Sequence, residues 1–504
     1  MNKYALVSVS DKNNIVDFCK RLNLLDYTIL ATGKTAKILA ENNVNCVEVS
    51  DYTGFPEIFD GRVKTLQPKI FGGILIRPDK KEDIKQAIEN NINQIEIVCV
   101  NLYPFPQVAA RADIDLDTKV ENIDIGGPSL IRAAAKNYKY VSVLTSPEQY
   151  DDFVTLLEEG KLDIEARQKL AVAAFAHTAY YDTVISNYFE KEFNVKKLDI
   201  RLNYKLYEQL RYGENPHQKA YYYGNFDNYF DFLHGKELSY NNIVDLNAAV
   251  ELISDMEETS CVIIKHTNPC GAAIGNTVYE AYTRALTTDP VSSFGGIVAF
   301  NAKVDLDTAK KLNEIFLEII CAPDYDVDAL EELRKKKNRR IIKIKNIEKA
   351  DIQIKSVLGG LLVQESDKSI FPKDTIKLVT KKECSPTEYE DLKLAWVICK
   401  HVKSNTIIYV KDKKVVGVGA GQMSRVDSAK IAGIKAKEQN HSLIGAVAAS
   451  DAFFPFADGL EEIIKNGITT VIQPGGSVRD NEVIAAADNS NIAMYFTGVR
   501  NFKH

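Results

Sequence analysis

The sequence predicts an α/β protein that begins with a doubly wound parallel sheet. Short apolar runs at 4–10, 27–31 and 95–100 have the length and β-branched content of buried strands. Helical patterns separate these runs, and the connecting loops are short. Polar turns follow directly after the strands. Strands that alternate with helices in this way are typical of a parallel sheet with helices on both faces.

The elements of the first 200 residues follow this alternation. A helix opens at Asp11-Lys12, because the apolar positions after it recur with the helical period. Another helix follows the turn Thr32 to Thr35. Further strands are expected at 44–49, 73–76 and 140–144, and further helices at 82–90, 130–137 and 164–189.

The C-terminal region mixes helices and strands again beyond a polar stretch at 190–203. A helix at 244–256 precedes the apolar strand Val262 to Ile264. The parts 210–385 and 386–504 share a faint order of strand, polar turn, helix and Gly-rich strand entry. This shared order predicts a duplicated α/β subdomain.

Composition is that of a soluble globular protein with a large core. The chain has 504 residues, 26% charged and 45% hydrophobic, and a net charge of −6. Neither nucleic acid nor a membrane is an expected partner, because there is no basic tail and no apolar run of about 20 residues. The basic cluster Arg334 to Arg340 is interpreted as a solvated helix end. The eight cysteines form no Cys-x-x-Cys pair, as expected for reduced thiols in the cytoplasm.

Four polar turns of the N-terminal region are expected at one edge of the sheet. A helix start at Thr32-Gly33-Lys34-Thr35 offers backbone N–H groups to a phosphate. It is not a P-loop, because Thr28 stands where the first glycine is required. The alternative is that these turns are ordinary helix caps. The turns are Ser10-Asp11-Lys12, Thr32-Gly33-Lys34-Thr35, Arg62-Val63-Lys64-Thr65 and Asn101-Leu102-Tyr103.

The pair Lys265-His266 ends the apolar strand Val262 to Ile264. An ammonium beside an imidazole at a sheet edge suits proton transfer at a nitrogen or carbonyl centre. The alternative is a strand-end charge and an ordinary turn histidine. A catalytic zinc is not expected, because alanine occupies position 273 and the chain has no His-x-Glu motif.

With these motifs in order along the chain, the sequence resembles the bifunctional enzymes of purine biosynthesis that combine AICAR transformylase with IMP cyclohydrolase. The motifs include the turns above, Asp124-Ile125-Gly126-Gly127, Leu210 to His217, Ile264 to Gly271, Ser293-Phe294-Gly295, Gly419-Ala420-Gly421-Gln422, Ser450 to Phe456 and Gly475-Gly476-Ser477.

The resemblance implies a methylglyoxal-synthase-like cyclohydrolase domain at 1–199. It also implies a transformylase domain at 200–504, built from two cytidine-deaminase-like subdomains. The implied substrates are AICAR and the formyl donor 10-formyltetrahydrofolate, which give FAICAR and then IMP. The resemblance further implies a cytoplasmic homodimer whose transformylase sites span the interface, with no catalytic metal.

For formyl transfer, the resemblance assigns His266 as the base, Lys265 as its partner and Asn405 beside the formyl group. Further positions match residues that bind AICAR or folate in the family. These are Arg211, Tyr212, Gly295, Glu318, Asn405, Arg425, Phe453, Asp458, Gly475, Gly476 and Arg500.

For ring closure, the resemblance assigns proton transfer to Lys136, with Lys64, Tyr103 and Asp124 as helpers. Lys136 also lies near a helix end, where the dipole favours a cation for structural reasons. The positions that match contacts to FAICAR or IMP are Ser10, Asp11, Lys12, Thr32, Gly33, Lys34, Thr35, Arg62, Val63, Lys64, Thr65, Asn101, Leu102, Asp124, Ile125 and Gly126.

Two positions depart from the family pattern. Lys34 stands where the family turn often has a second glycine, and Glu318 where some members have aspartate. Two other functions also remain open at this point. The N-terminal domain would be a nucleotide sensor without catalysis, or Lys265 would form a Schiff base, with or without pyridoxal phosphate.

Overall fold

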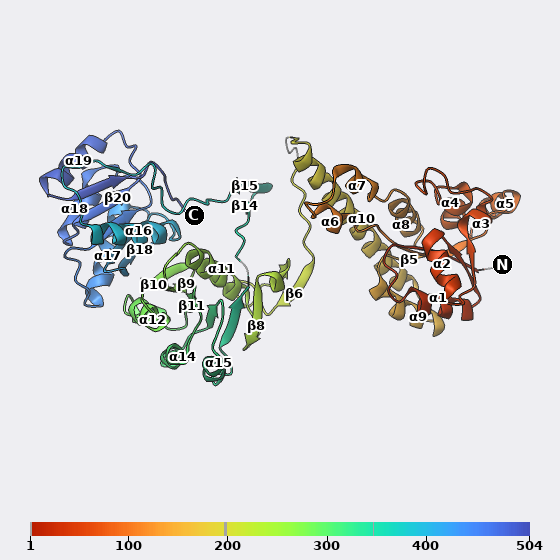
Figure 1. Cartoon of the computed structure of the whole chain (residues 1–504), viewed down its shortest axis with the longest axis horizontal. Helices are drawn as coiled ribbons and strands as arrows, with labels where there is room; N and C mark the ends of the chain where they lie inside the picture. The colour runs from red at the N-terminus through yellow and green to blue at the C-terminus, as the bar shows by residue number, and fades with distance from the viewer. Residues whose placement is uncertain (1–2, 196–198, 346) are drawn as a thin grey trace. The chain divides into compact units, whose positions relative to one another are not determined.

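The structure is a computed structural model that describes residues 3–195, 199–345 and 347–504. The chain divides into two compact units, Met1–Asn203 and Tyr204–His504 (Figure 1). Residues 196–198, within the polar stretch at 190–203, lie outside the described residues.

The N-terminal unit is built on a five-stranded parallel sheet with the strand order β3-β2-β1-β4-β5. Two apolar clusters cover the sheet, one on each face, so the strands carry apolar side chains on both sides. The strands are β1 (Lys3–Val9), β2 (Tyr27–Ala31), β3 (Cys46–Glu48), β4 (Ile95–Asn101) and β5 (Ser142–Leu144). The helices are α1 (Ile15–Leu24), α2 (Gly33–Glu41), α3 (Val49–Thr53), α4 (Pro68–Leu75), α5 (Lys81–Glu89), α6 (Phe105–Ala109), α7 (Leu116–Glu121), α8 (Gly126–Lys136), α9 (Tyr150–Glu158) and α10 (Ile164–Glu192).

The strand order places a switch point beside β1. The chain runs outward from β1 through β2 to β3, then returns to the other side of β1 for β4 and β5. Ligands in open α/β sheets bind outside the carboxyl ends of the strands at such a point. The candidate site of this unit is therefore at the ends of β1 and β4.

Two predictions for this unit are wrong in detail. The run at 73–76 is not a strand but the end of helix α4, which Pro68 starts from its first turn. Gly73 lets this helix lie against the next segment, because a Cβ there would be 2.5 Å from the carbonyl oxygen of Asn93. Helix α1 begins at Ile15 rather than at Asp11, since Asn14 has a left-handed φ of 59°.

The C-terminal unit is built on a twelve-stranded mixed sheet. Its order is β16-β21-β20-β19-β17-β18-β10-β9-β11-β12-β13-β8. The strands are β8 (Phe230–His234), β9 (Ser260–Lys265), β10 (Asn268–Ile274), β11 (Ile297–Phe300), β12 (Ile319–Ala322), β13 (Arg340–Ile344), β16 (Lys377–Leu378), β17 (Ile407–Lys411), β18 (Lys414–Gly419), β19 (Val447–Ser450), β20 (Thr470–Gln473) and β21 (Ala493–Phe496). Two small antiparallel pairs stand apart from it, β6 (Leu206–Leu210) with β7 (Ala220–Tyr223), and β14 (Ile352–Val357) with β15 (Gly360–Glu365).

The two halves of this sheet repeat one topology. A hairpin, β9–β10 or β17–β18, lies at the centre of each half, and β10 pairs with β18 in antiparallel fashion. Outward from the hairpin, each half adds one antiparallel strand, two parallel strands and a last antiparallel strand. The halves are therefore related by an approximate two-fold axis between β10 and β18.

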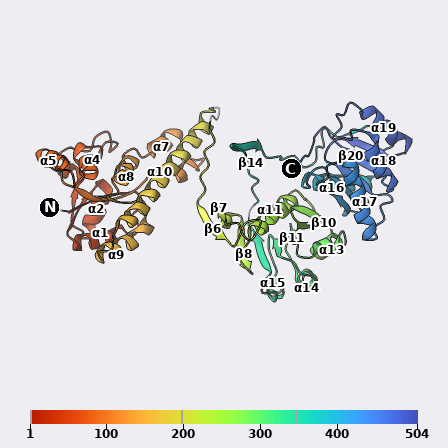
Figure 2. The same ribbon diagram turned by 180° about the vertical axis from the view of Figure 1, so that it is seen from behind.

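Helices cover both faces of the sheet (Figure 2). Helices α11 (Tyr240–Ser254) and α16 (Pro386–Lys400) share one continuous apolar core with strands of both halves. Each half has its own core on the opposite face. The helices there are α12 (Val278–Leu286), α14 (Leu306–Leu312) and α15 (Val327–Arg334) in the first half, and α17 (Arg425–Glu438), α18 (Ala457–Lys465) and α19 (Asp480–Asn489) in the second. The short helix α13 (Pro290–Ser293) precedes β11.

The basic cluster at 334–340 is only partly solvated. Arg339 and Arg340 are each 3% exposed, so the interpretation as a solvated helix end is wrong for these two. Arg339 donates to the carbonyl oxygens of Leu312, the last residue of α14, and of Ile315, which follows that helix. Arg340 begins β13 and faces the candidate site described below.

All eight cysteines are free thiols. Within the described ranges, no helix is long and apolar enough to cross a membrane.

A buried polar cluster joins the ends of the two central helices. Asp255 is the C-cap of α11 and His401 the C-cap of α16, and His401 Nε2 lies 2.9 Å from Asp255 Oδ2. Lys400 Nζ is 3.2 Å from the same oxygen, and Lys349 pairs with Oδ1. Burial acts to raise the pKa of Asp255, but the bonds from His401 and Lys349 and the charge of Lys400 lower it below its ordinary value. Burial lowers the pKa of His401, so the neutral ring donates from Nε2 while the lysines supply the positive charge.

Asp255→Asn is expected to lower the free energy of unfolding of the chain by about 3 kcal/mol at pH 7, because it leaves buried lysine charge without its partner. The lowered pKa makes this stabilisation present above about pH 4 and lost as the pH falls below that value. Denaturant unfolding of both proteins from pH 3 to pH 8 measures the difference. The control is Asp307→Asn on α14, whose carboxylate side chain is 80% exposed. An equal loss in both variants would contradict a special role for the cluster.

Candidate functional sites

The polar turns of the N-terminal unit meet at the carboxyl edge of its sheet, as predicted. Asn101, at the end of β4, accepts the backbone N–H groups of Ser10 at 2.5 Å and Asp11 at 2.8 Å. Its Nδ2 donates to the carbonyl oxygen of Asp11 at 2.9 Å. Both ends of the Asn101 amide therefore hold the turn after β1, across the switch point. Asn101 was predicted as a substrate contact, and its side chain here supports the neighbouring contact residues.

Three lysines converge beside this turn. Lys12 Nζ donates to the carbonyl oxygens of Val9 at 2.7 Å and Ser10 at 3.4 Å. Burial lowers the pKa of Lys12, and the nearby charges of Lys34 and Lys64 lower it further, against the opposite effect of Asp11. Three ammonium groups gathered in this way form a region suited to a phosphate.

Helix α2 points its N-terminus at the same edge. The hydroxyl of its N-cap residue Thr32 is hydrogen-bonded to Ser8 Oγ at 2.9 Å and does not cap the helix. The hydroxyl of Thr35 bonds to Val9. The first-turn N–H groups at Gly33 and Lys34 are therefore available for an anion, as a helix N-terminus favours. Lys34 lies in regular helix, so it does not disrupt this turn.

Asp124, Lys64 and Tyr103 form the second part of this edge. Lys64 Nζ lies 3.5 Å from the Tyr103 hydroxyl oxygen. Asp124 accepts the N–H of Gly127 at 2.7 Å. Burial raises the pKa of Asp124, although the Gly127 N–H and the charge of Lys64 act to lower it. A carboxyl group held this way is suited to exchange a proton closer to neutral pH than an ordinary aspartate.

The remaining predicted contacts differ in their exposure. Thr65 is buried, and a Cβ on Gly126 would lie 2.8 Å from its hydroxyl oxygen. Leu102 is 8% exposed and packs against Gly127, whereas Ile125 is 62% exposed. Val63 forms an isolated bridge with Ile58.

Arg62 and Lys136 differ from the other predicted residues in their surroundings. Arg62 pairs with Glu121, so its charge already has a partner. Lys136 ends α8, whereas Gly126 begins it; at about 1.5 Å per residue the two ends are about 15 Å apart. Lys136 lines a surface groove of about 870 Å³ together with apolar residues such as Phe71 and Phe175.

In the C-terminal unit, strand direction brings the predicted residues to one edge of the sheet. Strand β9 ends there at Lys265, and the antiparallel strands β11, β12 and β13 begin there. In the second half β17 begins at the same edge, and β19, β20 and β21 end there. The edge thus collects residues from about 240 positions of chain: Lys265, His266, Gly295, Glu318, Asn405, Phe453, Asp458, Gly475, Gly476 and Arg500.

Lys265 and His266 sit at the tip of the β9–β10 hairpin. Lys265 pairs with Asn268, so His266 and Thr267 form a two-residue turn. Lys265 Nζ donates to the carbonyl oxygen of Phe294, which places the ammonium beside Gly295. The His266 side chain is exposed, and no hydrogen bond to its ring occurs among the residues that the structure describes.

A charged group lies beside this hairpin at the starts of β12 and β13. Arg340 NH1 binds Glu318 Oε2 at 2.7 Å, and its other nitrogens donate to the carbonyl oxygen of Glu237. Burial lowers the pKa of Arg340, and Arg211 is close enough to lower it further. The Arg211 guanidinium lies 5.2 Å from the centre of the Tyr212 ring. Arg211, Tyr212 and Glu318 are therefore brought together, and Arg340 is an addition that the sequence motifs did not mark.

Asn405 is held by a network in the second half. Its Nδ2 donates to the carbonyl oxygens of Gln422 and Met423, and its Oδ1 accepts from Arg425 NH2 at 2.9 Å. Arg425 also binds buried Asp451 at 2.9 Å and the carbonyl oxygen of Phe453. All three guanidinium nitrogens of Arg425 thus have protein partners in this structure. Asp451 Oδ2 is buried and has no hydrogen-bond partner among the described residues.

The two halves of the edge are connected by Asn268. Its Oδ1 accepts the backbone N–H of Lys403 at 3.0 Å, two residues before Asn405. Its Nδ2 donates to the carbonyl oxygen of His266 at 3.1 Å. The His266 turn and the Asn405 loop therefore share one hydrogen-bonded link.

The glycines of the last loop are required by their surroundings. A Cβ on Gly475 would lie 2.4 Å from the Phe496 ring, and both Gly475 and Gly476 have positive φ, 73° and 94°. Gly476 donates its N–H to Asp480 at 2.7 Å. Asp458, in the first turn of α18, is exposed, and Phe453 is 36% exposed. Arg500 lies over the Phe502 ring, 4.4 Å from its centre.

Comparison with known proteins identifies the family. A family model described as the AICARFT/IMPCHase bienzyme matches residues 134–435, and an MGS-like domain matches residues 14–129. A relative from Persephonella marina, named bifunctional purine biosynthesis protein PurH, is 50% identical over 518 residues, with 100% of both chains covered. Relatives of the same name from Thermoanaerobacter and Bacillus cereus are also 50% identical, over 515 residues and 100% of both chains. The chain belongs to the AICARFT/IMPCHase bienzyme family.

Proposed function

We propose that the two sheet edges divide the two reactions of this bifunctional purine biosynthesis enzyme. The chain transfers a formyl group to AICAR and then closes FAICAR to IMP. We assign formyl transfer to residues 200–504 and ring closure to residues 1–199. The observation that carries the assignment is that each edge gathers one set of proton-handling side chains beside cationic groups.

For formyl transfer, His266 is the general base and Lys265 its electrophilic partner. The amine of AICAR is a weak nucleophile, because its lone pair is conjugated into the ring. His266 takes the proton as nitrogen attacks the formyl carbon of 10-formyltetrahydrofolate. The Lys265 ammonium stabilises the developing oxyanion or protonates the departing folate nitrogen. The amino group of Lys265 is already held by the carbonyl oxygen of Phe294, which favours this role over a Schiff base.

Substrate binding at this edge is assigned to both halves. Arg211 and Tyr212 would contact the nucleotide beside Glu318 and Arg340. Asn405 would lie beside the formyl group, and the hydrogen bond from Arg425 fixes its side chain. Arg425 therefore positions Asn405 in addition to binding substrate. The remaining binding positions are Gly295, Phe453, Asp458, Gly475, Gly476 and Arg500.

For ring closure, the carboxamide nitrogen of FAICAR attacks the formyl carbon and water is lost. Asp124 exchanges the proton, since burial already raises its pKa, and Lys64 with Tyr103 stabilises the carbonyl oxygen. The phosphate binds the N-terminus of α2 beside Lys12 and Lys34. The resemblance gives proton transfer to Lys136, but Lys136 lies at the other end of α8, so we assign the proton exchange at this edge to Asp124.

We also propose that the chain is a cytoplasmic homodimer and that its transformylase halves are cytidine-deaminase-like subdomains. The repeated strand order supports the duplicated subdomain. The β14–β15 hairpin supports the association of two chains. Its apolar side chains Leu358 and Leu362 are 105% and 60% exposed, and contact with a second chain would remove them from water. Free thiols at all eight cysteines are in keeping with a reducing compartment.

His266→Ala is expected to reduce formyl transfer by about 100-fold to 10,000-fold, because it removes the general base. Cyclisation of supplied FAICAR should remain at the wild-type rate, and an unchanged thermal unfolding transition of the C-terminal unit shows that the unit carrying the substitution is folded. Spectrophotometric assays of the two steps, run separately on the full chain, measure both. Equal loss of the two activities would contradict separate sites.

Asp124→Asn is expected to produce the opposite pattern, with cyclisation reduced by about 100-fold or more and formyl transfer retained. Since burial raises the pKa of Asp124, the acid limb of the wild-type cyclisation profile should lie above about pH 4 and should disappear in the variant. The matched control is Asp115→Asn, at the N-cap of α7 in the same unit. A variant that cyclises FAICAR normally would exclude Asp124, and a domain that never cyclises it would favour the nucleotide sensor.

A further inference from the structure

We infer that Asp245 is a positioning residue for formyl transfer, because its carboxylate holds the turn that carries His266. The inference rests on the role of His266 proposed above. Asp245 lies on α11, on a different element from the hairpin, and no sequence motif marked it.

The turn adopts a conformation that its residues do not favour. His266 has φ 52° and Thr267 φ 63°, so both lie in the left-handed region. Two-residue hairpin turns of type I′ need this backbone at both central positions, and Asn-Gly is the pair that adopts it most easily. This backbone is uncommon outside glycine; histidine adopts it more often than most residues, but a β-branched threonine there is a marked exception. The turn therefore needs support from outside its own sequence.

Asp245 provides this support with both carboxylate oxygens. Oδ1 accepts the backbone N–H of Thr267 at 2.7 Å, and Oδ2 accepts that of His266 at 3.3 Å. An ionised acceptor makes such bonds stronger than a neutral one. Without them, two amides of a strained turn would lose their partners.

The backbone is also what aims the imidazole. The His266 ring has no hydrogen-bond partner among the described residues, so neighbouring side chains do not fix its direction by hydrogen bonding. Lys265 anchors one end of the turn to Phe294, and Asn268 anchors the other to Lys403. Asp245 holds the middle, and a released turn would move the base relative to both substrates.

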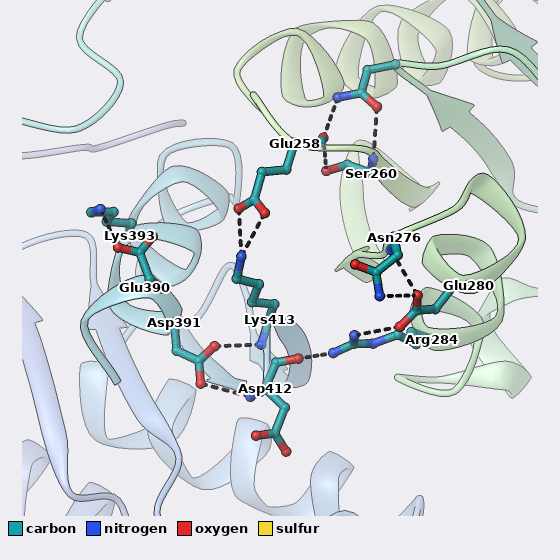
Figure 3. Close-up of polar contacts among 11 residues, drawn as sticks. Glu258, Ser260, Asn276, Glu280, Arg284, Glu390, Asp391, Lys393, Asp412 and Lys413 are labelled. Carbon is teal, nitrogen blue, oxygen red and sulfur yellow. Dashed lines mark hydrogen bonds and ion pairs between the residues drawn. The ribbon is translucent and has the colours of Figure 1, made fainter. Parts of the chain in front are cut away.

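The second half of the sheet contains the same device without the histidine. There the turn residues are Asp412 and Lys413, with φ 51° and 56°. Asp391 accepts their N–H groups at 2.8 Å and 2.5 Å, as Figure 3 shows. Asp245 and Asp391 each stand six residues after a serine N-cap with a capping box, Ser239 and Ser385. Because β17 runs antiparallel to β9 in the sheet, this second turn lies at the opposite edge from His266.

This repeat supplies a matched control. In the full-length chain, Asp245→Asn is expected to lower kcat for formyl transfer by about 10-fold to 100-fold, since small misplacement of a reacting group has effects of this size. The KM values for AICAR and 10-formyltetrahydrofolate should change by less than about threefold, and FAICAR cyclisation should not change. Asp391→Asn should lose similar thermal stability yet keep formyl transfer within about threefold.

Rescue separates positioning from direct chemistry. Glycine adopts a left-handed φ without steric cost, so adding Thr267→Gly to Asp245→Asn should restore most of the lost kcat. If the single variant does not fold, the double variant is compared with Thr267→Gly alone. A folded double variant that stays inactive, or equal loss of formyl transfer in Asp245→Asn and Asp391→Asn, would overturn the inference. His266→Ala, assayed alongside, tests the proposed function separately: full activity there would remove the role of His266 itself.

Discussion

The antiparallel pairing of β10 with β18 is the constraint on which the C-terminal unit depends. It joins two half-sheets of the same topology in opposite directions. The starts of β11, β12 and β13 therefore share an edge with the ends of β19, β20 and β21. With parallel joining, the loop of Asn405 and the turn of His266 would lie at opposite edges. In the helical layer, the hydrogen bond between Asp255 and His401, the C-caps of α11 and α16, likewise joins the two halves.

Repetition of the fold also separates structural from chemical roles. Lys411 Nζ donates to the carbonyl oxygen of Ile444 at 2.8 Å, just as Lys265 donates to Phe294 in the other half. The following residues, Gly445 and Gly295, both have positive φ, 76° and 71°. A lysine at this place is thus part of the subdomain, with or without chemistry. What distinguishes the edge proposed for formyl transfer is the histidine beside that lysine and the cationic residues around it.

The parts of the molecule differ in how far the sequence predicted them. Strands such as β1 and β9 were predictable, because their apolar runs are bounded by polar turns. The run at 73–76 was misread as a strand because its apolar pattern is equally compatible with a short buried helix, and only Pro68 marked the helix start. Arg340 and Asp245 lay outside reach because their roles depend on partners about 20 residues away, across strands or on another element. Periodicity carries no information on such pairings.

The electrostatics of the N-terminal edge explain why its site is built on fixed backbone. Lys12, Lys34 and Lys64 repel one another, and this repulsion opposes folding in the absence of an anion. The structure holds them through groups that cannot move independently: the turn after β1 is fixed by Asn101, and Lys34 is in the first turn of α2. A bound phosphate would attract the three ammonium groups and would also reduce the repulsion between them. The repulsion in the free protein therefore favours phosphate binding. The same principle applies to His266, whose turn is kept in an unfavourable conformation by Asp245. At both edges, the groups proposed to react or bind occupy costly arrangements because the sheet behind them is rigid enough to maintain them.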